Sequence, residues 1–521
     1  MNNWNKLTNT LLEHYHIKIP IKKRFFLYFV DDDKENINKI KIIEIINKLG
    51  FLKNDPRLIN FRSKMKLLVK TNSINYDEFS HCIENHLHIL KKIFNKDLII
   101  PDFSDFCLHI DKIYNDTIKD NSGNVADYIP QLARKDPSKY GVSLCTIDGQ
   151  RYNKGDTSDK FCIQSCCKTI NYGIALEEHG VDFVHKYVGR EPSGQSFNEL
   201  TLSKNGLPHN PLINSGAIMT TSLIKIDKPQ SHKFEHIIDV WNDLSGNFGT
   251  IGFDNAVYLS EKNTADRNFA LAYFMKEINE KKKVGFPENT NIIDILELYF
   301  QCCSIEINTE SLSIVAGTLA NGGINPLTGK VVFKSDTVKN MLSMMLMCGM
   351  YDYSGEFAFK IGLPAKSGVG GAIMLVIPNV MGIATWSPKL DTIGNSYRGI
   401  NFFKMFGEIF NFHIFDNIND ENKVNPTINK YNNTINNVEI CEACKNGDLE
   451  HIKILFQKNI NFNIKDYDNR TPLHIAVCEK NIDIIKYLVN TIKVKKNIKD
   501  RWGRMPVDEA DNNEEIINLL T

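Results

Sequence analysis

Apolar residues recur at helical spacing through the first 120 residues of the chain. Isoleucine occupies positions 37, 40, 42, 43, 45 and 46, just before Gly50, and a second periodic run covers residues 79–94. Such spacing is typical of amphipathic helices. We therefore predict a helical region over residues 1–120.

The pattern changes between residues 121 and 416, where strands and helices alternate. An apolar run at 141–147 ends in Asp148-Gly149, a dipeptide that favours hairpin turns. Two more apolar runs, 370–377 and 380–386, flank Pro378-Asn379 and predict a second hairpin. Strands early and late with helices between them predict an α+β fold in which both ends of the domain join one antiparallel sheet.

The composition changes again after Asp416. Residues 417–437 are rich in asparagine and poor in apolar side chains, which predicts a linker. Farther on, Thr-Pro-Leu-His-Ile-Ala at 471–476 is answered by Met-Pro-Val-Asp-Glu-Ala at 505–510, a shift of 34 residues. This period and the T-P-L-H motif are typical of ankyrin repeats. We predict all-α ankyrin repeats over residues 438–521, with a surface for a protein partner that no residue identifies.

Composition excludes several classes of function. Lys plus Arg and Asp plus Glu both number 62, so a net charge of zero gives no electrostatic case for nucleic-acid binding. The 12 cysteines include two adjacent pairs, Cys166-Cys167 and Cys302-Cys303, which favours reduced thiols in an intracellular protein. Pro378-Asn379 interrupts the best apolar run, and we predict no membrane span.

Three groups of metal-ligand residue types lack the spacing that a metal site requires. Asp31-Asp32-Asp33 could begin a calcium loop, but no frame offers glycine at the sixth position and an acid at the twelfth. His81, His86 and His88 fit an exposed helix face, and the single C-x-x-C of Cys441 and Cys444 fits packed helix positions. We predict no metal.

Ser165 and Lys168 form the chemically most suggestive pair in the chain. At this spacing on a helix both side chains lie on one face, so the amine can take the hydroxyl proton if burial lowers its pKa. Ser63-Lys66 and Ser222-Lys225 repeat the spacing. Only Ser165 lies between a polar, turn-rich stretch at 153–159 and an apolar helical run that includes residues 170–176. On spacing alone, an ordinary serine at a helix start remains the alternative.

Lys366-Ser367-Gly368 precedes the predicted second hairpin. Serine acyl-transfer enzymes of the β-lactamase type combine S-x-x-K with a later K-T-G strand that borders the site. Here serine replaces threonine. A glycine-rich strand edge without a catalytic role is the alternative.

Longer motifs carry a more specific resemblance. In chain order, these motifs are 127–133 (DYIPQLA), 155–157 (GDT), 161–168 (FCIQSCCK), 191–194 (EPSG), 208–218 (PHNPLINSGAI), 266–268 (DRN), 319–323 (LANGG), 348–352 (CGMYD) and 362–369 (GLPAKSGV). These segments, over roughly residues 119 to 415, resemble the glutaminase family. The resemblance implies a serine β-lactamase-like catalytic domain at 121–416. The flanking regions resemble those of the animal kidney- and liver-type enzymes, an EF-hand-like helical region and ankyrin repeats.

The resemblance also implies the reaction, hydrolysis of L-glutamine to L-glutamate and ammonia through an acyl-enzyme on Ser165. Lys168 would be the general base, and Tyr351 would relay the proton to ammonia. The backbone N–H groups of Ser165 and Val369 would hold the oxyanion.

Substrate contacts follow from the same resemblance. Glu261 would bind the α-ammonium group of glutamine. Asn214, Asn268, Tyr128 and Tyr299 would bind the α-carboxylate and the amide, and Ser165, Tyr351 and Val369 complete the substrate site.

The resemblance further implies a regulated oligomer. Residues 199–206 resemble a loop that gates the site at a contact between dimers, which suggests inorganic phosphate as an activator and no other cofactor. A homotetramer, a dimer of dimers, is expected, and filaments are an open alternative. The family favours mitochondria, whereas residues 1–20 contain no arginine, so a cytoplasmic location also stays open.

Two other functions remain as alternatives. The catalytic domain could have lost activity and serve as an ankyrin-bearing scaffold, although every matched position is intact. A β-lactam acylase would explain Ser165 and Lys168, but not the segments around Tyr128, Asn214, Glu261 and Asn268.

Overall fold

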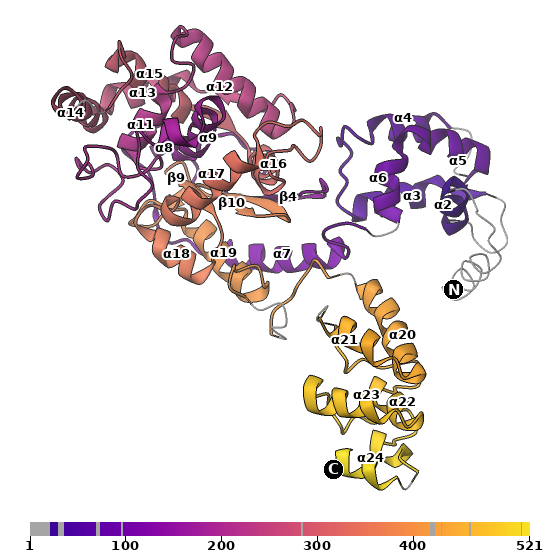
Figure 1. Ribbon diagram of the computed structural model, residues 1–521. Helices are drawn as coiled ribbons and strands as arrows, with labels where there is room; N and C mark the ends of the chain where they lie inside the picture. Colours follow the sequence, from indigo (N-terminus) through magenta and orange to yellow (C-terminus); the bar gives the residue numbers. More distant parts are fainter. Residues whose placement is uncertain are drawn as a thin grey trace. The chain divides into compact units, whose positions relative to one another are not determined.

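The computed structural model contains two compact units, Met1–Thr427 and Ile428–Thr521 (Figure 1). It describes residues 21–29, 36–68, 73–94, 97–282, 285–416, 422–428, 430–457, 460–511 and 513–520. The sequence expectations for residues 1–20, for Asp31-Asp32-Asp33 and for the start of the linker at 417–421 lie outside these ranges.

The N-terminal region is helical, as predicted, and has its own apolar core. A short antiparallel pair, β1 (Ile37–Asn38) and β2 (Ser73–Ile74), joins the segment between α2 and α3 to the segment between α4 and α5, which is an EF-hand-like arrangement. The helices are α2 (Ile21–Phe29), α3 (Lys39–Lys48), α4 (Ile59–Leu67), α5 (Tyr76–Ile83), η1 (Glu84–His86) and α6 (Leu87–Phe94).

Two polar side chains after β2 form a capping box at the start of α5. The Asn75 side chain accepts a hydrogen bond from the backbone N–H of Glu78, and the Glu78 side chain accepts one from the backbone N–H of Asn75. The predicted exposed face of three histidines is wrong for His86. Its Nδ1 lies 3.0 Å from Arg57 O and its ring packs on Phe61, so it is half-buried.

A five-stranded antiparallel sheet of order β5-β4-β11-β10-β9 forms the centre of the first unit. Its strands are β4 (Gly141–Thr146), β5 (Arg151–Gly155), β9 (Ala365–Gly368), β10 (Ala372–Ile377) and β11 (Met381–Trp386). Strands from both ends of the domain therefore share one sheet, as predicted. Residues 153–155, expected in a polar loop, instead finish edge strand β5.

Both faces of this sheet are buried. Along β10, Ala372, Met374 and Val376 belong to one core, whereas Ile373, Leu375 and Ile377 belong to the other. Successive strand residues point to opposite faces, so this alternation places an apolar layer on each side. α7 and α19 cover one face (Figure 1), and α16 packs on the other. The predicted boundary at residue 120 groups α7 with the helical region, yet α7 packs on the sheet.

The remaining elements of the first unit surround this sheet. Helices are α7 (Phe103–Thr117), α8 (Pro130–Ala133), η2 (Gln164–Cys166), α9 (Cys167–His179), α10 (Val181–Val184), α11 (Asn214–Ser222), α12 (Gln230–Ser245), α13 (Asn255–Thr264), α14 (Asp266–Lys282), α15 (Ile292–Cys303), α16 (Thr309–Ala320), α17 (Ser335–Cys348), η3 (Tyr351–Tyr353), α18 (Ser354–Lys360) and α19 (Tyr397–Ile409). Two small sheets complete the unit. In one, β8 (Ile305–Ile307) lies between β6 (Phe161–Cys162) and β7 (Gly252–Phe253), and in the other β12 (Lys389–Leu390) pairs with β3 (Asn124–Val125).

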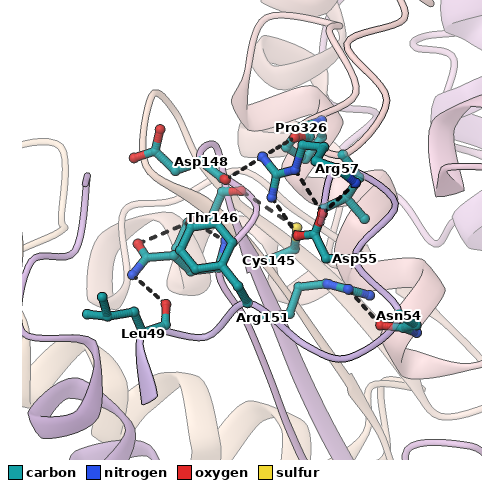
Figure 2. Close-up of polar contacts among 12 residues, drawn as sticks. Leu49, Asn54, Asp55, Arg57, Cys145, Thr146, Asp148, Arg151 and Pro326 are labelled. Atoms are coloured by element: carbon teal, nitrogen blue, oxygen red, sulfur yellow. Dashed lines mark hydrogen bonds and ion pairs between the residues drawn. The ribbon is translucent and has the colours of Figure 1, made fainter. Parts of the chain in front are cut away.

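A polar cluster joins the helical region to the β4–β5 turn (Figure 2). Asp55 is fully buried and holds Arg57 through two side-chain contacts, of 2.7 and 3.0 Å. Arg57 Nη1 in turn donates to the carbonyl oxygens of Asp148, at 2.8 Å, and Pro326, at 3.0 Å. Gly149 is required in this turn because a Cβ there would lie 2.3 Å from Arg57 Nη2.

Two further side chains extend this junction. Gln150 Nε2 donates to Leu49 O and Ile100 O, and Arg151 donates to Asn54 and Glu310. The helical region therefore packs on the catalytic domain through a buried, hydrogen-bonded junction, which we call the clasp (residues 55, 57, 148, 150 and 151).

The second unit consists of stacked helix pairs around a separate core. Its elements are α20 (Lys430–Asn446), α21 (Leu449–Gln457), α22 (Pro472–Cys478), α23 (Ile482–Lys486), η4 (Tyr487–Ile492), η5 (Pro506–Glu509) and α24 (Glu514–Leu520). The repeat identified from sequence appears as three helix pairs, and α20 begins at Lys430, before the expected start at residue 438. In the part of the chain that the structure describes, no helix has the length and apolar character that a bilayer span requires.

Candidate active site

Ser165 lies where β6 turns into the helix pair η2 and α9. It is 9% exposed, and the residue before it, Gln164, has a φ of 48°. A left-handed conformation costs energy in a residue other than glycine, and such residues concentrate at functional sites. Gly368 of β9 approaches this turn so closely that a Cβ there would lie 2.6 Å from Ile163 O. The nucleophile turn and strand β9 are therefore in direct contact.

Lys168 is completely buried on the first turn of α9. Its amine donates to Asn214 Oδ1 at 2.6 Å and to Leu212 O at 3.4 Å, and none of its hydrogen bonds goes to Ser165. No carboxylate among the described residues forms an ion pair with it. Burial therefore lowers the pKa of Lys168 to about 8. A neutral amine that donates two N–H groups to carbonyl oxygens keeps its lone pair for a proton.

A second buried amine, Lys366, lies on β9. It pairs with Met374, which faces the α16 side of the sheet, and its Nζ lies 4.6 Å from the centre of the Tyr351 ring. Its Nζ donates to Ser367 O at 2.6 Å. Burial, and then the positive charge of Lys168, lower the pKa of Lys366 to about 7. Two amines with depressed pKa values thus flank one site.

Tyr351 begins η3 with a φ of 54°, a second strained residue at the site. Its hydroxyl is buried without a hydrogen bond of regular geometry. Burial raises the pKa of Tyr351, and the Ser165 side chain partly offsets that rise, so the two hydroxyls are neighbours. An unpartnered buried hydroxyl next to a nucleophile is available to a reacting group.

Glu261 of α13 supplies the negative charge at the other side of the site. Tyr128 OH donates to its Oε1 at 2.6 Å, and Gln164 Nε2 donates to the same atom at 3.1 Å. Burial raises the pKa of Glu261, and these two hydrogen bonds oppose that rise. No cation pairs with Glu261 among the described residues, so a ligand ammonium group would complete its environment.

Asn214, Asn268 and Tyr299 form a chain of side-chain contacts that ends at Lys168. Asn214 Nδ2 donates to Asn268 Oδ1 at 2.9 Å, and Tyr299 OH donates weakly to Asn214 Oδ1 at 3.5 Å. Asn214 therefore presents its carbonyl oxygen to Lys168 and its amide to Asn268. Three helices, α11, α14 and α15, supply these residues.

Val369 occupies the tight turn between β9 and β10, where Gly371 N donates to Gly368 O. The backbone N–H of Val369 has no hydrogen-bond partner among the described residues. A methyl group placed on Gly394 would lie 3.7 Å from Val369 Cγ1 and 3.8 Å from Tyr351 Cε2, so Val369 and Tyr351 border one space.

Phe197 covers this space from the loop that follows residue 191. Its ring centre lies 5.7 Å from Lys168 Nζ and 4.9 Å from the centre of the Tyr351 ring. A cavity of about 580 Å³ opens beside it, lined by residues 192–197 on one side and by residues around Tyr351 on the other. Ser165 and Lys168 do not line this cavity.

The structure brings together every site residue named from the sequence. It adds Gln164 and Phe197, to which the sequence assigned no role, and Lys366, which the sequence placed only in a strand that could border the site. Gln164 is next to the nucleophile and Lys366 stands in the K-S-G motif, so position gave a signal for both. The two other S-x-x-K serines lie elsewhere: Ser63 is exposed on α4, and buried Ser222 donates to Met219 O.

One candidate cation cluster occurs among the described residues. Cys162, Asp254 and Glu306 place their ligand atoms within 4.8 Å of one another. However, Asp254 already caps α13 by accepting from Ala256 N and Val257 N. Cys441 and Cys444 occupy α20, where Cys444 is part of the repeat core.

Comparison with known proteins identifies all three regions. Family models match as Glutaminase over residues 123–415, Ankyrin repeats (3 copies) over 415–520 and EF-hand domain over 21–101.

Individual proteins agree with these family matches. The chain is 43% identical over 512 residues to the "Glutaminase liver isoform, mitochondrial" of Rattus norvegicus, covering 96% of this chain and 84% of that protein. A solved structure titled "Probable glutaminase ybaS" superposes with a TM-score of 0.56 at 35% identity, covering 60% of this chain and 98% of that one. Another, of Mglu "in its glutamate form", gives 0.55 at 32% identity, with 59% and 69% covered.

These matches confirm the family resemblance and the order of fold types deduced from the sequence. The chain belongs to the glutaminase family and is an enzyme that hydrolyses glutamine to glutamate and ammonia.

Proposed function

We propose that Ser165 attacks the side-chain amide of L-glutamine and that Lys168 accepts the serine proton. The observation that carries this proposal is the buried Lys168 amine, whose pKa is lowered to about 8 and whose two donated hydrogen bonds end on carbonyl oxygens. A serine needs such a base because its hydroxyl is a weak nucleophile at neutral pH.

The Ser165 oxygen adds to the amide carbon and gives a tetrahedral oxyanion. The unpartnered N–H of Val369 and the N–H of Ser165 would stabilise that oxyanion, and the close contact between Gly368 and the nucleophile turn supports this pairing. The C–N bond then breaks as Tyr351 OH, beside Ser165, passes a proton to the departing ammonia and receives in its place the proton that Lys168 took from Ser165. Water hydrolyses the acyl-enzyme in the second half of the reaction.

Charge placement supports glutamine as the molecule bound. Glu261 would pair with the α-ammonium group, and Tyr128 and Gln164 hold its carboxylate in position. Asn268, Asn214 and Tyr299 offer neutral hydrogen-bonding groups for the α-carboxylate and the amide. The solved structure of Mglu in its glutamate form supports an amino-acid-binding site in the family.

We propose that the enzyme is a homotetramer regulated by inorganic phosphate at residues 199–206. A hollow of about 300 Å³ between this loop and α14, lined by Leu200, Leu202, Phe274 and neighbours, supports an interface there. Leu200 and Tyr273 are exposed. Measuring mass by light scattering with and without phosphate tests both points.

A mitochondrial location is proposed from the mitochondrial liver isoform that the chain resembles. The ankyrin unit is proposed to bind another protein. Exposed Tyr467 and Trp502 on its repeat turns support a docking role. Imaging of the tagged full chain tests the location.

The catalytic proposal is tested by ammonia release from L-glutamine by full-length Ser165→Ala protein. We expect a rate at least about 10³-fold below wild type, since unactivated water replaces the nucleophile poorly. Ser63→Ala is the matched control, because it removes the serine of another S-x-x-K motif and should keep full activity. A Ser165→Ala enzyme that is folded and fully active would refute the assignment.

A further inference from the structure

The two adjacent-cysteine pairs of the sequence meet behind the nucleophile. Cys167 is the first residue of α9 and Cys303 is the last residue of α15, and their sulfur atoms lie 3.9 Å apart. Both side chains are buried, Cys167 completely and Cys303 at 6% exposure. No other two thiols of the described residues are within hydrogen-bond distance of one another.

The neighbouring cysteines have different surroundings. Cys166 Sγ donates to Lys366 O on the far side of the turn. Cys302 faces Asn171. Neither sulfur contacts a second thiol. The geometry therefore selects the 167–303 pair among the four cysteines near the site.

Each of the two cysteines is close in sequence to a residue whose side chain contacts Asn214. Cys167 directly precedes Lys168, whose amine binds Asn214. Cys303 lies one helical turn beyond Tyr299, whose hydroxyl reaches the same Asn214 oxygen. Burial raises the pKa of Tyr299, and the neighbouring Cys303 thiol adds to the rise.

We propose that Cys167 and Cys303 form a reversible disulfide that switches the enzyme off under sustained peroxide. The proposal rests on the function assigned above to Lys168. One thiol reduces hydrogen peroxide and becomes a sulfenic acid, with release of one water. The second thiol then attacks that sulfur and forms the S–S bond, with release of a second water. Two thiols are oxidised and one peroxide is reduced.

The bond requires the two sulfur atoms to approach by nearly 2 Å, because a disulfide is about 2.05 Å long. In the proposal, this approach draws the start of α9 toward the end of α15, and Lys168 and Tyr299 move with their helices. A catalytic constellation tolerates little displacement, because rate depends steeply on geometry. The hydrogen bond with Cys167, and then burial, raise the pKa of the Cys303 thiol, so oxidation is slow and responds to lasting rather than brief exposure.

The experiment exposes full-length protein to hydrogen peroxide, alkylates the remaining thiols and maps peptides without reduction. We expect a linked peptide pair containing Cys167 and Cys303, at least a tenfold loss of glutaminase activity and recovery with dithiothreitol. Cys167→Ala and Cys303→Ala, each compared with its own untreated rate, should resist the loss. Cys302→Ala is the matched control and should behave like wild type.

Alkylated Cys167 and Cys303 in the inactivated protein would overturn the proposal, as would equal inactivation of Cys167→Ala and wild type. The peptide map of wild-type protein decides the cross-link even where a variant does not fold. Full glutaminase activity in a folded, reduced Lys168→Met protein would refute the function assigned to Lys168. The peptide map of the oxidised wild-type protein would still show whether the disulfide forms.

Discussion

The clasp and the active site are both buried polar clusters, but they differ in how their charges are balanced. In the clasp, Arg57 faces the fully buried carboxylate of Asp55 at 2.7 Å, and its remaining donors reach carbonyl oxygens. At the active site, Lys168 and Lys366 are completely buried with no carboxylate ion pair among the described residues. The site also contains the unpartnered Tyr351 hydroxyl.

The active site and the clasp also differ in backbone conformation. Gln164 and Tyr351, with φ of 48° and 54°, flank the chemistry. No clasp residue has a positive φ, and in the turn between clasp residues 148 and 150 the positive φ falls on Gly149, where it causes no strain. A paired cluster stabilises the fold, whereas an unpaired one costs stability and keeps groups available for reaction.

Replacing Lys168 by methionine should lower activity and raise stability, and so separate the catalytic role of this residue from its effect on the fold. We expect ammonia release to fall at least about 10³-fold, because the substitution removes the amine that accepts the Ser165 proton. Stability should rise by about 2 to 3 kcal/mol at pH 7. The pKa of Lys168 falls from 10.5 to about 8 on folding, so the charged amine opposes folding below pH 8, and this penalty disappears between pH 8 and 10.5.

Urea denaturation at pH 7 and at pH 10.5 measures this stability gain. Lys262→Met is the control, since Lys262 forms a partly exposed ion pair with Glu297. A Lys168→Met protein that is less stable than wild type at pH 7 would contradict the claim that the unpaired charge of Lys168 lowers the stability of the fold.

Arg57→Ala should have the opposite signature. Removing the arginine leaves Asp55 buried and unpaired, which typically costs about 3 to 5 kcal/mol. The urea midpoint should fall, while kcat of the folded enzyme stays close to wild type. Lys92→Ala provides the contrast, because Lys92 is 42% exposed in its ion pair with Asp148 and should contribute less than about 1 kcal/mol. Equal midpoints for Arg57→Ala and wild type would show that the clasp has no stabilising role.

Tyr351→Phe should reduce kcat by about 10²-fold, the range of a lost proton-transfer group. Stability should change by less than about 1 kcal/mol, because the hydroxyl makes no hydrogen bond of regular geometry and its hydroxyl neighbour is Ser165. Tyr353→Phe, in the same η3 helix, is the matched control for both readouts. Wild-type kcat in Tyr351→Phe would exclude the proton relay.

The pH profile of the wild-type enzyme tests the Lys168 pKa without any substitution. Only the neutral form of Lys168 can act as a base, so kcat/KM should rise about tenfold per pH unit below 8 and level off above it. Assays of the wild-type enzyme between pH 6 and 9 measure this. A profile that is flat over the whole range would contradict a base with this pKa.

The extent of sequence prediction differs between fold and site. Alternating side chains along β10 and the Asp148-Gly149 turn depend on local patterns, so the sheet was predictable. The partners of Glu261 were not, because Tyr128 and Gln164 lie 133 and 97 residues away in sequence. Family resemblance supplied Glu261 and Tyr128. The position of Gln164 beside Ser165 gave a signal, but its hydrogen bond to Glu261 and its positive φ came from the structure.

The sequence by itself determined the α+β domain, the 34-residue repeat and the position of Ser165 before a buried helix. Those features follow from spacing along the chain, which sets the face on which each side chain lies. Only the tertiary structure decided that burial lowers the pKa of Lys168, that Arg57 donates to the Asp148 carbonyl and that Cys167 meets Cys303. Burial, charge pairing and thiol contact are produced by residues that are distant in sequence, so no local pattern encodes them.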